Sequence, residues 1–132
     1  MRRAAAGLRR LDNLPTRVLT SPLVRARQTA ELLASEARWP EAAVVSALAP
    51  AQPVRPLFRL LAAHKVGCLA VVGHEPDLGY LLTYCVCGDS GSVQVEFRKG
   101  GIACVVFGGA MRPGRGQLRW LLPPRVLRAM AR

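Results

Sequence analysis

An unbroken apolar run that ends in a tight turn constrains this chain more than any other feature of its sequence. Leu69 to Gly73 is continuously apolar, and the sequence HEPD (74–77) follows it directly. A run of this kind is typical of a strand that a parallel sheet buries on both faces. Asp77 is then predicted to cap a helix from Leu78 to Cys85, since its carboxylate accepts hydrogen bonds from first-turn amides. The pattern therefore predicts a strand, a turn and a helix in direct succession.

The same succession occurs earlier in the chain. Arg17 to Thr20 is predicted to form a short strand, and a helix is predicted from Pro22 to Glu36. Ser21 suits the N-cap of that helix and Pro22 its first position, because the N–H that proline lacks would have no partner there. Arg25 lies about one turn into the helix, where free amides and the helix dipole favour an anion. This second junction predicts a phosphate site.

The remaining segments complete an alternation of helices and strands, which predicts an α/β sandwich. In such folds ligands bind beyond the carboxyl ends of the strands, so both junctions are expected to face one crevice. We predict further helices over 2–11 and 54–63, strands over 43–46, 101–107 and 117–122, and turns or loops over 12–15, 48–53, 88–92 and 111–116.

A single globular domain is expected from 132 residues of which 51% are hydrophobic and 20% charged. The longest apolar runs are too short to span a bilayer, and the apolar stretch between the N-terminal arginines is too short for a signal peptide. We therefore expect a cytoplasmic protein without a membrane span. The cysteines have no C-x-x-C spacing and are interpreted as small buried hydrophobic residues in a reducing compartment: Cys68, Cys85, Cys87 and Cys104.

The formal net charge of +11 comes from 19 basic and eight acidic residues. Such a surplus permits binding to nucleic acids or acidic partners through the long-range field. Only 5% of the residues are aromatic, however, and no nucleic-acid motif is recognisable. We interpret the surplus as a solvated basic surface. A basic nucleic-acid-binding domain is a less favoured alternative. Nucleic acid is therefore not among the partners we expect.

His74 is the residue in the second junction that can carry chemistry. Histidine can titrate near neutrality, donate to a phosphoryl oxygen or act as a nucleophile. Arg25 and His74 would together suit a compact dianion such as phosphate. A purely structural role for a histidine at a strand end is the alternative.

Five blocks of the sequence occur in an order that a known family shares: TSPLVRARQTAELLA, ALAP, VVGHEPDLGYLL, FRKGGIACVVF and GQLRWLLPPRVLRAM. In these blocks the chain resembles the histidine phosphatase superfamily, in its SixA-type phosphohistidine phosphatase branch. The resemblance implies a phosphoglycerate mutase-like fold, a three-layer α/β/α sandwich with a mixed, mostly parallel sheet, as a single domain over 1–132. It also implies hydrolysis of a phosphoryl group through a phosphohistidine intermediate, with no cofactor and no metal. Arg25 matches the family's helix arginine, His74 matches its second histidine, and Ser21 is expected to bind phosphate beside them.

One motif of the family is absent from the 132 residues. In the family, an Arg-His-Gly after the first strand supplies the nucleophilic histidine and another phosphate-binding arginine, and this chain has no such sequence. His64 precedes the strand whose far end carries His74, and five strand residues span about 17 Å. His64 is therefore expected at the edge of the sheet opposite the predicted phosphate site. The chain as given is expected to lack the first central strand and the catalytic loop, and to be inactive as a phosphatase.

A non-catalytic pseudoenzyme that binds phosphate or a phosphoprotein is the main alternative. In-frame DNA upstream of Met1 that encodes a strand ending in Arg-His-Gly would instead indicate a truncated or mis-started enzyme. A serine hydrolase is disfavoured because no G-x-S-x-G is present, and HEPD lacks the second histidine of the zinc motif H-E-x-x-H.

The implied partners are a phosphohistidine-bearing protein or a small phosphorylated substrate, and inorganic phosphate or sulfate is expected to fit the site. Glu75 and Asp77 are expected to serve the turn and the helix cap, since a phosphohistidine leaving group needs little acid assistance. Loss of the central strand would leave the strands at 69–73 and 101–107 without their shared neighbour. Either these two strands close the gap, or the fold is only marginally stable.

Overall fold

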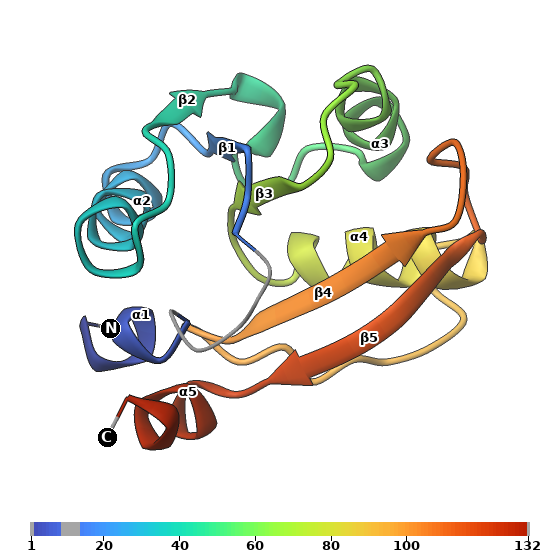
Figure 1. Ribbon diagram of the computed structural model, residues 1–132. Coiled ribbons are helices and arrows are strands. Elements are labelled where there is room, and N and C mark those ends of the chain that lie inside the picture. Colours follow the sequence, from blue (N-terminus) through green and yellow to red (C-terminus); the bar gives the residue numbers. More distant parts are fainter. Residues whose placement is uncertain (1, 9–13, 132) are drawn as a thin grey trace.

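The computed structural model describes residues 2–8 and 14–131, and Figure 1 shows how their helices surround the strands. In chain order the elements are α1 (Arg2–Leu8), β1 (Arg17–Thr20), α2 (Val24–Ala37), β2 (Ala42–Val44), the 3-10 helix η1 (Ser46–Leu48), α3 (Val54–Ala62), β3 (Leu69–Val72), α4 (Asp77–Cys87), β4 (Ile102–Phe107), β5 (Gly116–Leu122) and α5 (Pro124–Met130).

Three of the strands form a parallel sheet in the order β2-β1-β3. Thr20, the last residue of β1, is level with Val44 at the end of β2 and with Val72 at the end of β3. The carboxyl ends of the three strands therefore lie along one edge of the sheet. The strands β4 and β5 form a separate antiparallel pair.

A hydrophobic cluster on each face of the strands makes the molecule a three-layer α/β/α sandwich. Val18 of β1 packs into a cluster with residues of α1, α2 and α5, whereas its neighbour Leu19 packs into a cluster with α3 and α4. Successive residues of a strand point to opposite faces, so the two clusters lie on opposite sides of the sheet. The mixed α/β sandwich predicted from the sequence is confirmed.

The helices α1 and α5 lie against each other near the two ends of the chain (Figure 1). Gly7 allows this contact, because a Cβ atom there would lie 1.9 Å from the carbonyl oxygen of Leu127. Ala4 and Ala5 of α1 and Leu127 of α5 are almost completely buried in the same cluster. Small side chains on α1 therefore set how closely the two helices approach.

The start of α2 differs from the prediction. Ser21 is not the N-cap of the helix and Pro22 is not its first residue, since α2 begins at Val24 with Leu23 as N-cap and without a side-chain cap. The physical reason is that the sheet extends one residue further, because the Ser21 N–H donates to the carbonyl of Val72 at 2.9 Å. The extended backbone at Ser21 delays the helix.

The start of α4 also differs from the prediction. The helix begins at Asp77 with Pro76 as N-cap, and no side chain caps it in the usual geometry. Asp77 Oδ2 instead accepts the N–H of Ala51 at 2.8 Å, and Glu75 Oε1 accepts the N–H of Gly79 at 3.1 Å. The turn role expected for Glu75 is confirmed, whereas the carboxylate of Asp77 holds a separate loop.

Several element bounds shift by a few residues. The helix predicted over 2–11 is described as Arg2–Leu8, and its predicted residues 9–11, with 12 and 13 of the predicted turn, lie outside the described residues. The strand predicted over 43–46 is Ala42–Val44, because Ser46 begins η1. The helix predicted to end at Cys85 continues to Cys87, where Gly88 in the left-handed region ends it. The seven residues of α5 are too few for periodicity to predict a helix.

Burial is lower than predicted in two places. Only Val72 of β3 is buried and every residue of β4 is half-buried, although both sequences are typical of strands covered on both faces. Of the cysteines only Cys85 is buried, while Cys87 is exposed and the other two are half-buried. None of the helices in the described ranges is both long enough and apolar enough to cross a bilayer.

Candidate functional site

The two predicted junctions meet at the carboxyl edge of the parallel sheet. The strands β1 and β3 are neighbours that end level with each other, and Ser21 and His74 follow them. His74 Nε2 lies 2.7 Å from Ser21 Oγ, although 53 positions separate the two residues in the chain. The structure therefore brings two of the three predicted site residues into direct contact.

Ser21 connects the imidazole of His74 to the beginning of α2. Its side chain is completely buried, and its Oγ accepts the N–H of Leu23, the N-cap residue, at 3.2 Å. A hydroxyl that accepts one hydrogen bond can still donate its own proton or accept a second one. The same oxygen therefore holds both the His74 ring and the first turn of the helix, and His74 lies beside the N-terminus of α2.

The expectation that Ser21 binds phosphate stays a prediction, and in the structure its Oγ contacts the N–H of Leu23 and Nε2 of His74. Because Nε2 of His74 is engaged by Ser21, Nδ1 is the ring nitrogen that stays available to a ligand. Ser21 is therefore a positioning residue, because it sets the orientation and the tautomer of the His74 imidazole.

Arg25 is the second residue of α2 and is exposed. Within residues 2–8 and 14–131 its guanidinium makes no hydrogen bond or ion pair, since the only bond of Arg25 outside the helix ladder is the one its backbone carbonyl accepts from Thr29. The first-turn amides of α2 have no side-chain cap apart from the Leu23 N–H described above. A free guanidinium at the positive end of a helix is a suitable group for binding an anion.

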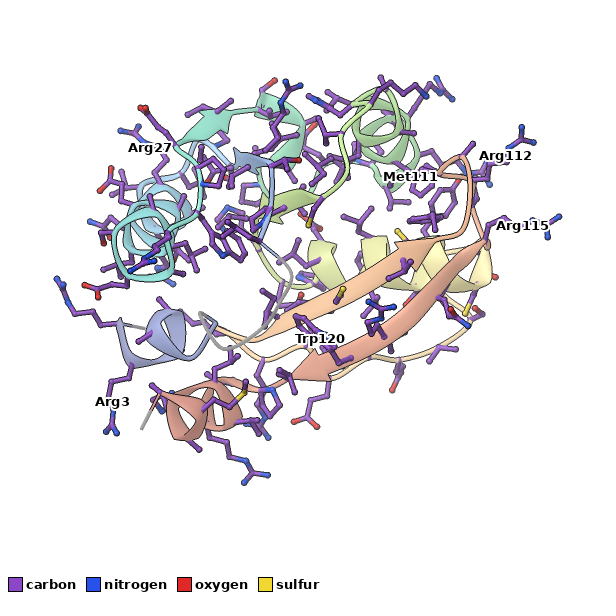
Figure 2. The ribbon with its side chains drawn as sticks, viewed as in Figure 1. Arg3, Arg27, Met111, Arg112, Arg115 and Trp120 are labelled. Carbon is purple, nitrogen blue, oxygen red and sulfur yellow. The ribbon has the colours of Figure 1, made fainter. Side chains whose placement is uncertain are left out.

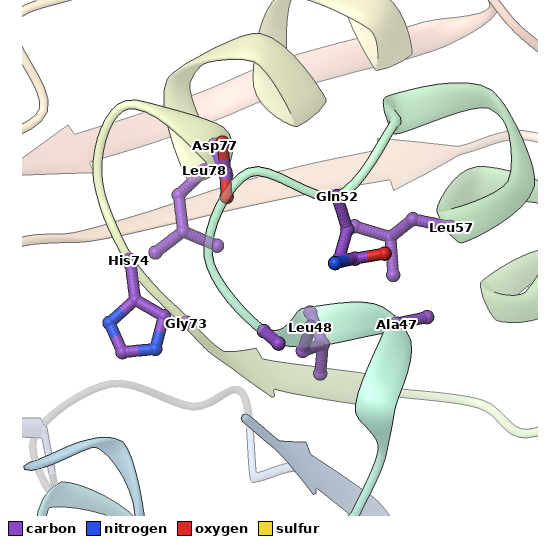
Figure 3. Close-up of a pocket in the computed structure, with 9 residues that line it drawn as sticks. Ala47, Leu48, Gln52, Leu57, Gly73, His74, Asp77 and Leu78 are labelled. Carbon is purple, nitrogen blue, oxygen red and sulfur yellow. The ribbon is translucent and has the colours of Figure 1, made fainter. Parts of the chain in front are cut away.

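A small, mostly apolar pocket is lined in part by His74 (Figure 3). His74, Gln52 and Asp77 are the polar side chains that line it, together with Leu48, Leu57 and Leu78. Asp77 fixes the loop that carries Gln52, because it binds the N–H of Ala51, which has a left-handed φ of 64°. The sequence predicted a loop over 48–53 but not its contact with Asp77, since no local pattern links Ala51 to a residue 26 positions away.

The carboxyl of Glu75 next to His74 is perturbed. Burial raises its pKa, the N–H of Gly79 lowers it to a smaller extent, and the nearby charge of Asp77 raises it further. Glu75 is nevertheless an exposed residue whose Oε1 stabilises the first turn of α4. The geometry gives it a structural contact at the edge of the site.

His64 lies at the opposite end of the strands, as predicted. Its Nδ1 is 3.1 Å from the guanidinium of Arg17, the first residue of β1. His74 follows the far end of β3, so the two histidines cannot serve one site. No group of three or more side chains that could hold a metal ion occurs in the part of the chain that the structure describes.

The arrangement of layers and strands is that of the histidine phosphatase fold. Among solved structures, the protein histidine phosphatase SixA complexed with tungstate matches with a TM-score of 0.82 and 29% identity, over 96% of this chain and 80% of that one. The SixA structure from Agrobacterium tumefaciens, described as a phosphohistidine phosphatase, matches with a TM-score of 0.73 and 21% identity, over 93% and 77%. The chain therefore has the SixA-type fold.

Among curated proteins, an uncharacterized protein from Picosynechococcus sp. strain PCC 7002 is 36% identical over 96 residues. These residues are 70% of this chain, and the chain spans 58% of that relative's length. No protein-family model matches the chain.

Proposed function

We propose that the carboxyl edge of the parallel sheet binds a phosphoryl group in a protein of the phosphohistidine phosphatase type. Arg25 and His74 contact the phosphoryl oxygens, and Ser21 orients His74. The observation that carries this proposal is the 2.7 Å contact between His74 and Ser21, which sets the imidazole beside the free N-terminus of α2. The similar SixA structure that holds tungstate supports it, because tungstate is a tetrahedral oxyanion like phosphate.

Phosphohistidine hydrolysis has two steps in this kind of enzyme. An imidazole nitrogen attacks phosphorus, so a new N–P bond forms while the bond to the leaving nitrogen breaks, and water then hydrolyses the N–P bond to release phosphate. Cationic and hydrogen-bonding groups hold the equatorial oxygens in both steps. Arg25 and His74 suit this binding role.

Neither histidine of the 132 residues suits the role of nucleophile. His64 lies at the other end of the strands, and His74 corresponds to the second histidine of the family that the sequence resembles, whose nucleophile is in an Arg-His-Gly motif. We therefore propose that residues 1–132 by themselves bind phosphoryl groups without turnover. A phosphohistidine-bearing protein and a small phosphorylated molecule are the two classes of ligand proposed for this site.

Titration calorimetry with inorganic phosphate and with tungstate tests the binding site. Arg25→Ala is expected to weaken binding by about 10- to 100-fold, because a charge-assisted hydrogen bond is lost. Arg27→Ala is the matched control, since Arg27 is an exposed arginine two positions further along the same helix (Figure 2). Equal affinities of the two variants would contradict the proposed site.

Phosphate release from a phosphohistidine peptide tests the absence of turnover. The chain 1–132 is expected to release no more phosphate than the buffer does, while it still binds phosphate. Release that His74→Ala abolishes would show that this site turns phosphohistidine over, and would overturn this part of the proposal.

A further inference from the structure

One polar side chain of the pocket beside His74 has no partner among the described residues. Gln52 lines this pocket from the loop before α3, and Figure 3 shows it on the side opposite His74, with Leu48 and Leu78 between them. Within residues 2–8 and 14–131 the carboxamide of Gln52 makes no hydrogen bond. A carboxamide has donors and an acceptor, so Gln52 can bind a polar group that enters the pocket.

The pocket and α2 lie on opposite faces of the parallel sheet. Leu48 and Leu57 line the pocket and belong to the cluster with α3 and α4, whereas α2, which carries Arg25, packs into the cluster on the other face. His74 contacts both regions, because it lines the pocket and its Nε2 lies 2.7 Å from Oγ of Ser21, shortly before α2. A group attached to a phosphoryl that Arg25 and His74 bind can therefore extend past the imidazole into the pocket.

Asp77 holds the loop that carries Gln52. Its Oδ2 accepts the N–H of Ala51 at 2.8 Å, and Ala51 has a φ of 64°. Alanine rarely adopts this left-handed conformation, which persists only where the surrounding structure holds it. Because Ala51 directly precedes Gln52, the carboxylate of Asp77 fixes the direction in which the chain enters Gln52. The position of the carboxamide therefore depends on Asp77.

The walls of the pocket determine which kind of group fits there. Apolar side chains form most of the lining, and Gln52 adds a neutral polar group: Ala47, Leu48, Leu57 and Leu78. Such a lining suits a group with an apolar body and one polar atom, and the imidazole of a histidine side chain has both. An imidazole that is phosphorylated on one nitrogen keeps its second nitrogen for a hydrogen bond. A phosphorylated serine has neither the ring nor this nitrogen.

We propose that Gln52 is a specificity-determining residue that binds the ring of a phosphohistidine side chain, and that Asp77 is a positioning residue that acts on Gln52 through Ala51. The carboxamide N–H donates to the ring nitrogen that is not bonded to phosphorus, while Leu48 and Leu78 contact the ring. This inference rests on the proposed phosphoryl site, and it selects a phosphohistidine side chain from the two classes of ligand proposed there.

Calorimetric titration with three probes tests the role of Gln52. The probes are inorganic phosphate, a phosphoserine peptide, and a peptide of the same sequence with a triazole phosphonate, a phosphohistidine analogue whose C–P bond does not hydrolyse. The chain should bind the analogue about tenfold more tightly than the phosphoserine peptide, as one hydrogen bond and the ring contacts allow. Gln52→Ala should remove this preference and leave the Kd of phosphate unchanged. Gln117→Ala is the matched control, since Gln117 is an exposed glutamine of β5.

Substitutions of Asp77 test its positioning role with the same probes. Asp77→Ala should weaken binding of the analogue about tenfold, as Gln52→Ala does, without a change in phosphate affinity. Asp77→Asn should keep most of the affinity, because its amide oxygen can still accept the N–H of Ala51. The double variant should bind no more weakly than Gln52→Ala alone, since Asp77 acts only through that side chain.

The matched control for Asp77 is Asp89→Ala. Asp89 also holds a loop, since its Oδ1 accepts the N–H groups of Gly91 and Ser92 beyond the other end of α4. This variant should bind all three probes as the unchanged chain does. A loss of analogue affinity in Asp89→Ala as large as in Asp77→Ala would mean that general loosening, and not the position of Gln52, causes the effect.

The outcomes separate this inference from the proposed phosphoryl site. If phosphate binds and Gln52→Ala has the same affinity for the analogue as the unchanged chain, only the role of Gln52 is wrong. Equal binding of the analogue and the phosphoserine peptide would mean that the pocket does not recognise the ring. If Asp77→Asn loses as much affinity as Asp77→Ala, the role of Asp77 through Ala51 is wrong. Absence of phosphate binding would overturn the phosphoryl site and this inference with it.

Discussion

Replacing Ser21 by alanine should reduce stability and phosphate affinity together. The hydroxyl is completely buried, accepts the Leu23 N–H at 3.2 Å and contacts His74 Nε2 at 2.7 Å. Alanine leaves the Leu23 N–H and an imidazole nitrogen of His74 without this partner. A buried polar group that loses its partner costs about 1–3 kcal/mol. For a chain of this length the loss corresponds to a decrease of about 4–10 °C in Tm.

Two assays follow the substitution. Differential scanning calorimetry measures Tm, and calorimetric titration measures phosphate binding, which should weaken because the ring of His74 is no longer held beside α2. Ser35→Ala is the matched control, since Ser35 is an exposed serine of the same helix whose hydroxyl donates to the Leu32 carbonyl. If Ser21→Ala and Ser35→Ala have the same Tm and the same phosphate affinity, the positioning role of Ser21 is wrong.

Three further predictions concern packing, thiol reactivity and pH. Gly7→Ala should destabilise the fold by about 1–3 kcal/mol in urea unfolding, because its Cβ would meet the backbone of α5 at 1.9 Å, and Gly67→Ala, with open space around the new Cβ, should not. Burial raises the pKa of the Cys85 thiol to about 12, so a thiol reagent at about pH 8 should leave Cys85 unmodified until the chain unfolds. Cys87 is exposed and should react in the folded chain, and the variant Cys87→Ser should lose that reaction. Burial raises the pKa of Glu75, so the stability that this carboxyl contributes is present below its unfolded pKa and is lost as pH rises through its folded pKa. Glu75→Gln should therefore raise Tm at about pH 7, where Glu75 is charged, but not at about pH 3. The same difference in Tm at both pH values would contradict this.

The local sequence pattern was sufficient to predict the bounds of several strands and helices. The strand predicted over Arg17 to Thr20 has these bounds in the structure, and the helix predicted from Val54 ends within one residue of its predicted end. Apolar periodicity and turn residues act over a few positions, so they can be read along the chain. The position of His74 at a strand end followed from the same kind of pattern.

The capping predictions were wrong for a common reason. Serine and aspartate can bind the amides of a following helix, but they bind other partners equally well. Ser21 still accepts the N–H of Leu23, but it is not the N-cap and it also contacts His74, while Asp77 contacts the backbone of Ala51; both His74 and Ala51 are distant in the sequence. Local propensity cannot tell which partner a polar side chain meets after the strands have aligned.

The sequence by itself determined the alternation of strands and helices and the apolar faces that become the two clusters. It also determined that Arg25 lies in the helix after one strand and that His74 lies just after another. Only the tertiary structure decided that Ser21 holds His74, and that β3 and β4 lie in one layer without pairing. The physical reason is that these features depend on strand order and register. Backbone pairing sets both between segments that are distant in the chain, whereas propensity and periodicity describe only neighbouring residues.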